Sequence, residues 1–316
     1  MRRGTLAEPP RQTPERGARR VWGPENLIEI ADRWGTLQVP KSAVISTYAP
    51  KGGCYKTSLS LNIARYAALN GARVVVVGLD PQADLTAAFA VQQPAENLEA
   101  LRAIEQQTVG LLDVCRGRPI HEALLDTDIP GLSLVPEKAD LARLEHELSG
   151  RISREAWLSN AVIRPLFESD RAPNLIIFDC PPTWSALVAA SIYAADLVVH
   201  PLEVSSMAFR GIDYWLSSVR DFELDLGRKM EVKYIPTRYH PRRALASEIL
   251  GSYRADSPGP GLCSPLSVIR DSSDGEEASA AGLSIPEYRP RSPAAAEMRE
   301  AVTEIFTKIA EIEARS

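Results

Sequence analysis

The sequence has few cysteines, and they lie far apart. Its 316 residues include four cysteines, with no CxxC pair and no cluster of cysteine and histidine. This spacing argues against a zinc site and against a disulfide framework, and it favours a reducing compartment. The four positions are Cys54, Cys115, Cys180 and Cys263.

Long apolar runs are also missing. The most hydrophobic stretch, from Leu187 to Val199, is interrupted by Ser191 and Asp196, so it does not suit a membrane span. The first residues carry two arginines but no apolar core of a secretory signal. We therefore expect a cytoplasmic protein with no membrane partner.

Net charge is modest, but its distribution is uneven. The chain has 36 Lys and Arg against 41 Asp and Glu, which gives −5. Residues 1–20 nevertheless contain six arginines and two glutamates, and residues 228–254 contain seven basic and two acidic side chains. Two basic segments in a mildly acidic protein favour local contact with a polyanion.

Short apolar runs alternate with helical patterns after Pro40, and four consecutive valines from Val74 to Val77 are typical of a strand buried on both faces. Further runs lie at residues 43–48, 132–135, 175–178, 197–200, 232–235 and 266–269. Strands separated by helices predict an α/β fold, with a mostly parallel twisted sheet and helices on both faces. Because ligands bind such sheets at the carboxyl ends of strands, the loops after residues 48, 79 and 178 are the candidate site.

Two regions differ in composition. Residues 1–20 are polar and rich in proline and arginine, which predicts a flexible tail, and residues 26–34 could form a short helix. We expect a tail over residues 1–41 and one folded domain over 42–316. The last helix of that domain has an apolar stripe with a mixed acidic opposite face, which favours core packing over membrane binding.

A glycine-containing loop follows the first predicted strand. Residues 51–57 read Lys-Gly-Gly-Cys-Tyr-Lys-Thr. Backbone N–H groups converge in such a turn, and the dipole of the following helix favours a phosphate there. Lys56 would then reach the β- and γ-phosphates, and the Thr57 hydroxyl would bind Mg²⁺. The usual G-x-x-x-x-G-K-[ST] pattern fails at Pro50 and Tyr55, whereas K-G-G-x-x-K-[ST] fits. The alternative is a glycine turn with two surface lysines.

With this loop the sequence resembles the ParA/MinD group of deviant Walker-A ATPases, a P-loop NTPase fold, over roughly residues 42–312. Tyr55, where most members have glycine, resembles the plasmid ParA partition proteins. The resemblance implies a dimer that closes around ATP, in which Lys51 contacts the phosphates bound by the partner subunit. The ATP-binding residues that it implies are Lys51, Gly52, Gly53, Cys54, Tyr55, Lys56, Thr57 and Ser58.

Two carboxylates follow predicted strands. Residues 78–82 read Gly-Leu-Asp-Pro-Gln, where the family pattern is D-x-D-P-Q, so Asp80 matches and Gly78 does not. By resemblance Asp80 orients or activates the attacking water and is catalytic together with Lys51 and Lys56; the alternative is a turn aspartate. Asp179 ends the strand at 175–178 and would hold Mg²⁺ through a water, with Thr57 as the direct ligand.

Candidate DNA contacts lie near the second basic segment. Arg242 and Arg243 are expected to begin a helix that runs to residue 250 and buries Leu245 and Ile249. ParA proteins bind DNA non-specifically in this region, and such phosphate contacts give affinity without sequence readout. The resemblance makes Arg242 and Arg243, with Arg270 after them, the candidate DNA-binding residues. A solvated basic surface is the alternative.

The resemblance therefore implies an ATP-dependent DNA partition ATPase with slow basal turnover. Its cofactors would be ATP and Mg²⁺, and its partners would be a second copy, non-specific DNA and a ParB-like protein that stimulates hydrolysis. The protein would be nucleoid-associated. One alternative is a related ATPase that positions a protein cargo, such as a chemoreceptor cluster or a microcompartment, over the nucleoid. Others are a biosynthetic amidoligase or reductase on this fold, and an inactive binding module.

Overall fold

A computed structural model describes residues 39–90, 108–227, 229–255 and 267–315 of the chain. Its centre is a seven-stranded sheet in the order β3-β4-β2-β5-β1-β6-β7. Neighbouring strands are parallel except β3 and β4, which pair antiparallel. The strands are β1 (Ala43–Thr47), β2 (Val74–Gly78), β3 (Leu125–Asp126), β4 (Leu132–Val135), β5 (Leu175–Asp179), β6 (Leu197–Glu203) and β7 (Val232–Thr237).

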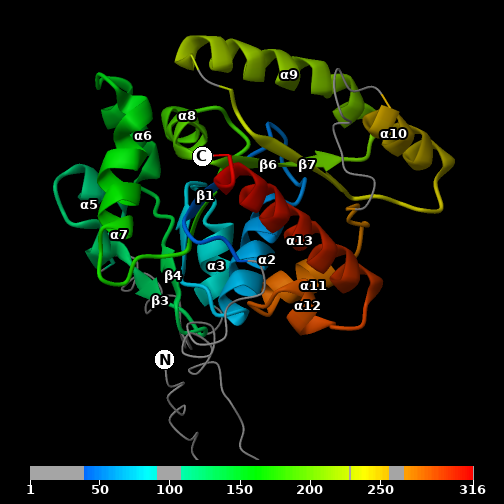
Figure 1. Cartoon of the computed structure of the whole chain (residues 1–316), viewed down its shortest axis with the longest axis horizontal. Coiled ribbons are helices and arrows are strands. Elements are labelled where there is room, and N and C mark those ends of the chain that lie inside the picture. Colours follow the sequence, from blue (N-terminus) through cyan, green and yellow to red (C-terminus); the bar gives the residue numbers. More distant parts are fainter. Residues whose placement is uncertain (1–38, 91–107, 228, 256–266, 316) are drawn as a thin grey trace, which may run out of the picture.

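Helices cover both faces of the sheet, as the sequence predicts (Figure 1). One face packs against α2 (Lys56–Leu69), α3 (Asp84–Ala90), α11 (Asp274–Ala280), α12 (Ile285–Tyr288) and α13 (Pro293–Glu313). The other face packs against α5 (Leu111–Cys115), α6 (Leu141–Ser149), α7 (Arg164–Phe167), α8 (Ala186–Ala194), α9 (Ser206–Leu226) and α10 (Ala244–Ala255). Single turns η2 (Ile120–Ala123), η3 (Arg154–Ala156) and η4 (Ser159–Ile163) connect elements on that second face.

The valine run of β2 explains this three-layer arrangement. Val74 and Val76 belong to the core beneath α2 and α13, whereas Val75 and Val77 belong to the core on the opposite face. Successive side chains of a strand point to opposite faces, so a strand in a doubly covered sheet must be apolar at every position. The apolar stripe of α13 lies in the first of these cores, which confirms its assignment to core packing.

Two predicted elements are wrong in detail. The described part of 266–269 forms no strand: Ile269 exchanges backbone hydrogen bonds with Pro236 and Tyr239 only where β7 ends. Helix α10 begins at Ala244, so Arg242 and Arg243 lie in the turn before it, and Leu245 is 56% exposed. The helix therefore begins two residues later than predicted, after the turn that follows β7. Ile249 is buried, as expected.

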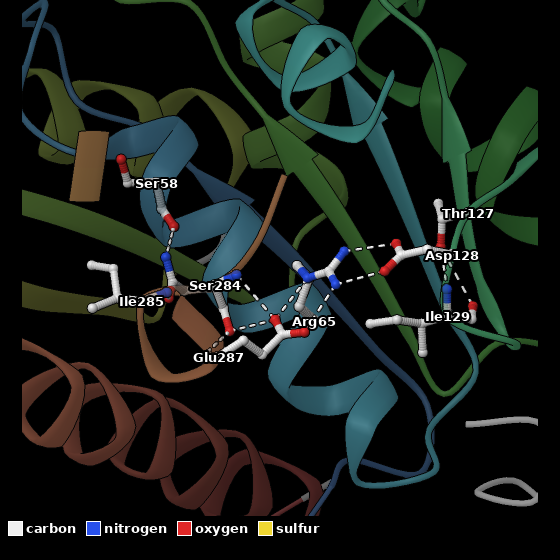
Figure 2. A network of polar contacts seen from close by, with 9 residues as sticks. Ser58, Arg65, Thr127, Asp128, Ile129, Ser284, Ile285 and Glu287 are labelled. Atoms are coloured by element: carbon white, nitrogen blue, oxygen red, sulfur yellow. Dashed lines mark hydrogen bonds and ion pairs between the residues drawn. The ribbon is translucent and has the colours of Figure 1, made fainter. Parts of the chain in front are cut away.

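A buried arginine fastens this scaffold (Figure 2). The Arg65 side chain is 1% exposed and donates hydrogen bonds of 2.7–2.9 Å to two carboxylates, Asp128 before β4 and Glu287 in α12. Glu287 also closes a capping box with Ser284 at the start of α12. Burial alone would lower the pKa of Arg65, but its bonds to Glu287 and Asp128 raise it overall. The network joins α2 to segments far along the chain.

Replacing Arg65 with methionine should destabilise the fold strongly, because it leaves two carboxylates without their cation. Loss of one partner from a buried ion pair costs about 3–5 kcal/mol, and the partial exposure of both acids favours the lower end. Urea unfolding would measure the loss. Arg143→Met, at a mostly exposed α6 position, is the control and should cost less than about 1 kcal/mol. Equal effects of the two changes would contradict a stabilising role for the network.

Candidate nucleotide-binding site

The carboxyl ends of three neighbouring strands meet at one point. In the sheet register Asp179 at the end of β5 lies opposite Thr47 of β1 on one side and Gly78 of β2 on the other. The loop of residues 50–55 follows β1, and Asp80 follows β2. The three loops that the sequence singles out are therefore adjacent.

A cavity of about 970 Å³ opens beside these strand ends. Its volume suits a small-molecule ligand or cofactor. The predicted residues in its lining are Gly52, Gly53, Tyr55, Lys56, Thr57, Ser58 and Asp80. Lys51, Cys54 and Asp179 are not in the lining. The Cys54 side chain is buried under the loop, where its thiol contacts the Lys51 carbonyl at 3.1 Å.

The loop backbone uses the left-handed conformation twice, at Gly53 (φ 69°) and at Tyr55 (φ 74°). Glycine adopts this conformation without strain, whereas a bulky side chain pays for it. The Tyr55 ring reaches across to the segment before α11, where its hydroxyl lies 3.4 Å from Asp271 and from the Ser272 carbonyl. Tyr55 thus links the loop to the far wall of the cavity.

The two lysines of the loop have different surroundings. Lys56 is buried, and its Nζ donates to the Lys51 carbonyl at 2.7 Å, so its charge lies in the hollow of the loop. The Lys51 side chain is about one-third exposed, and its Nζ pairs with Glu203 at the end of β6 at 2.5 Å. Lys56 is placed to serve the cavity of its own chain. Lys51 would have to leave Glu203 before it could contact a partner's nucleotide.

Thr57 and Asp179, the two predicted metal ligands, lie together. The Thr57 hydroxyl donates to Asp179 Oδ2 and the Ser60 hydroxyl donates to Oδ1, both at 2.8 Å. Burial raises the pKa of Asp179 to about 6, while these two hydroxyl donors lower it. Hydroxyl and carboxylate oxygens are suitable ligands for Mg²⁺, and a divalent cation would offset the buried charge. The residues present therefore fit a magnesium ion.

Asp80 is half-buried and lines the cavity opposite the loop. Its Oδ1 accepts the backbone N–H of Gln82 at 3.0 Å. The turn that the sequence offered as an alternative therefore forms, and the same carboxylate also faces the cavity. A carboxylate held in this way can accept a hydrogen bond from a water near the phosphates.

One wall of the cavity was not anticipated from the sequence. It comes from the end of β7 and from α11, far along the chain: Arg238, Asp271, Ser272, Ser273, Gly275, Glu276, Ser279 and Ala280. Arg238 donates to the Gly53 carbonyl at 3.2 Å and pairs with Asp271 at 3.3 Å. No local sequence signal marks this wall, because it forms only when the carboxyl ends of β7 and β1 come to the same edge of the sheet.

The three candidate DNA-binding arginines divide into two kinds. Arg242 and Arg243 are exposed and form no ion pair within the described part of the chain. Arg270 instead binds Glu297 of α13 through two nitrogens at 2.5–2.8 Å. Its guanidinium is therefore already paired, and this weakens its case as a phosphate contact.

None of the described helices combines the length and the hydrophobicity that a membrane-spanning segment needs. Cys54, Cys115 and Cys180 are buried free thiols, and Cys263 lies outside the described residues. Cys180 packs among the Ser46 and Ser191 hydroxyls at 3.2–3.4 Å. These thiols act as small core residues.

Comparison with known proteins indicates the family to which this nucleotide-binding site belongs. The AAA_31 family, described as an AAA domain, matches residues 42–232, which is more than half of the chain. The chromosome-partitioning ATPase Soj of Thermus thermophilus is 28% identical over 264 residues, covering 83% of this chain and 94% of the relative.

Two solved structures share the fold. Apo McdA of Cyanothece superposes with a TM-score of 0.69 at 19% identity, covering 83% of this chain and 98% of that one. Cobyrinic acid a,c-diamide synthase of Mycobacterium smegmatis, with a bound ATP analogue and magnesium, gives 0.58 at 26% identity, with 78% and 92% covered. A biosynthetic synthase thus shares this architecture, so the fold alone does not assign the function. The chain belongs to the AAA_31 family and to the ParA/MinD group of P-loop ATPases.

Proposed function

We propose that this chain is a DNA partition ATPase whose ATP-bound dimer binds DNA non-specifically and is stimulated by a ParB-like partner. The carrying observation is the pair of loop lysines, because Lys56 faces its own cavity whereas Lys51 lies outside it, on Glu203. A lysine that the chain's own cavity does not use can contact a second subunit once it leaves Glu203. The similarity to the chromosome-partitioning ATPase of Thermus thermophilus supports the same assignment.

Nucleotide binding in this proposal couples to the dimer through Lys51. Phosphates in the cavity would draw the loop and its cations toward them, and Lys51 would exchange Glu203 for the triphosphate of the partner. Asp80 would orient the attacking water, and Mg²⁺ held by Thr57 and Asp179 would neutralise charge on the phosphates. Among the described carboxylates of the cavity lining, Asp80 is the one that the family pattern assigns to the attacking water, and we expect slow basal turnover.

DNA contact in this proposal uses the turn before α10. Arg242 and Arg243 are exposed there, whereas Lys233, Arg238 and Arg270 are each held by an acid. Unpaired arginines can exchange bound counterions for phosphates, which gives salt-sensitive binding without sequence preference. The division into a tail over residues 1–41 and an ATPase domain over 42–316 stays a prediction, because residues 1–38 lie outside the described residues.

The direct test is binding to a random-sequence duplex without nucleotide and with ADP, ATP or a non-hydrolysable analogue, at two salt concentrations. Binding only with ATP or the analogue, fading with salt, would support a nucleoid-associated switch. Intact ATP hydrolysis without DNA binding in any state would overturn the partition role. A protein cargo in place of DNA cargo is the alternative, and capture of a ParB-like protein by the ATP-bound dimer would separate the two.

Arg242→Glu should weaken this DNA binding at least tenfold and leave basal ATPase unchanged, because the turn lies outside the nucleotide cavity. The slope of log affinity against log salt should fall by about one, as expected for one lost phosphate contact. Arg143→Glu on α6, at the opposite end of the molecule in Figure 1, is the charge-matched control. An equal loss in both variants would mean that net charge alone, not this turn, governs binding.

A further inference from the structure

Position 78 has no room for a side chain. A Cβ added to Gly78 would lie 2.5 Å from Cδ of Glu137, 2.8 Å from its Oε1 and closer still to its Cγ. The φ of Gly78 is not positive, so the backbone does not require glycine here. The carboxyl group of Glu137 therefore fills the space into which a residue at the end of β2 would project.

Glu137 is 3% exposed and follows β4 by two residues. Its Oε2 accepts hydrogen bonds from both the backbone N–H and the hydroxyl of Thr86, each at 2.8 Å. Its own N–H donates to the Thr86 hydroxyl, also at 2.8 Å. Because Thr86 lies in the first turn of α3, Glu137 holds the start of the helix that the Asp80 loop leads into.

The second carboxyl oxygen points the other way. Oε1 of Glu137 is buried, has no hydrogen-bond partner within the described residues, and is the oxygen nearest to position 78. Burial raises the pKa of Glu137 to about 8, with contributions from the charges of Asp179 and Asp80. A buried acid with an unsatisfied oxygen is costly, and such groups concentrate at functional sites.

We propose that Glu137 is a positioning residue for ATP hydrolysis: it supplies, from the loop after β4, the carboxyl group that position 78 lacks, and through Thr86 it fixes the Asp80 loop. The inference rests on the proposed ATPase function. The D-x-D-P-Q pattern has its first acid at position 78, and here the acid reaches the same space from the loop after β4. The carboxyl group thus lies where the pattern would place it in space, although it belongs to a residue far from position 78 in the sequence.

The test uses the full chain with single-turnover ATP hydrolysis and with binding of a fluorescent ATP analogue. Glu137→Ala should lower the hydrolysis rate 10- to 100-fold, the range typical of residues that orient a site from behind it. Analogue affinity should change less than about threefold, since Glu137 does not line the cavity. Thr86→Val, which removes the hydroxyl but keeps the shape, should show a smaller loss of the same kind.

Rescue provides the decisive comparison. Gly78→Asp alone should not hydrolyse ATP at the wild-type rate, because its Cβ collides with the Glu137 side chain. The double variant Gly78→Asp with Glu137→Ala should hydrolyse ATP at least tenfold faster than Glu137→Ala. The control double variant, Gly78→Ala with Glu137→Ala, adds a side chain without a carboxyl group and should hydrolyse ATP no faster than Glu137→Ala. This comparison holds even where Glu137→Ala alone folds poorly.

Three results would overturn the inference. They are a wild-type rate in Glu137→Ala, equal recovery in both double variants, and no recovery in the aspartate double variant although it binds the analogue. A wild-type chain that binds the analogue but hydrolyses no ATP would instead overturn the proposed function, so the two failures are distinguishable.

Discussion

Lys56→Ala abolishes ATP binding in our expectation, with a dissociation constant raised at least about 100-fold. Lys56 is buried in the hollow of the loop, and its Nζ lies 2.7 Å from the Lys51 carbonyl. Charge-assisted hydrogen bonds contribute about 1.5–3 kcal/mol each, and an ammonium group here would make more than one to a triphosphate. Titration of the diluted chain with a fluorescent ATP analogue measures the loss.

Lys51→Ala is the matched control for this experiment. It removes a lysine five residues away in the same loop, but one whose side chain pairs with Glu203 outside the cavity. At concentrations where the chain is monomeric, analogue affinity should stay within about fivefold of wild type. Equal losses in the two variants would mean that the loop needs positive charge in general, and the assignment of Lys56 to its own nucleotide would fail.

The sheet was predictable because its central strands are short runs made mostly of buried apolar residues. The runs that became β1, β2, β5, β6 and β7 lie between helices, and only a doubly covered sheet buries them all. The run at 266–269 has the same composition but forms no strand within its described part. Ile269 exchanges backbone hydrogen bonds only with Pro236, near the end of β7, and with Tyr239, just beyond it, so the pairing is too short to form a strand.

The phosphate loop was predictable because its chemistry is local in sequence. Backbone N–H groups, a lysine and a hydroxyl all come from residues 51–58, next to a strand and a helix. The far wall of the cavity and Glu137 depend instead on tertiary contact. Glu137 meets the start of α3, more than fifty residues earlier, through the packing of β2 beside β4. No spacing rule links such positions.

The mismatch at Gly78 shows that a local pattern cannot report a side chain supplied by another part of the chain. From the sequence, glycine at the first position of D-x-D-P-Q is an absent acid. In the structure, the absence of a side chain at Gly78 leaves room for the side chain of another acid, Glu137. Arg270 is a second case in which a tertiary contact changes the interpretation. The sequence makes it a candidate DNA contact, but in the structure it forms an ion pair with Glu297 of α13, 27 residues further along the chain.

Asp80→Ala should lower the rate of ATP hydrolysis about 10²–10⁴-fold and trap an ATP-bound dimer, because general-base assistance contributes within that range. ATP binding should persist, since Lys56 and Thr57 are unchanged and line the cavity themselves. Single-turnover hydrolysis gives the rate, and sedimentation with ATP gives the fraction of dimer. Asp84→Ala is the control: it removes a second carboxylate of the cavity lining, an exposed one, and the variant should hydrolyse ATP normally.

Asp80→Asn separates the two roles that the structure gives this side chain. Its amide oxygen can still accept the Gln82 N–H and keep the turn, but it cannot take a proton from water. A rate as low as that of Asp80→Ala would assign the effect to the carboxylate as base. A rate near wild type would assign Asp80 to the turn alone. Another group in the cavity would then have to orient the attacking water, and normal hydrolysis by Asp80→Ala would lead to the same conclusion.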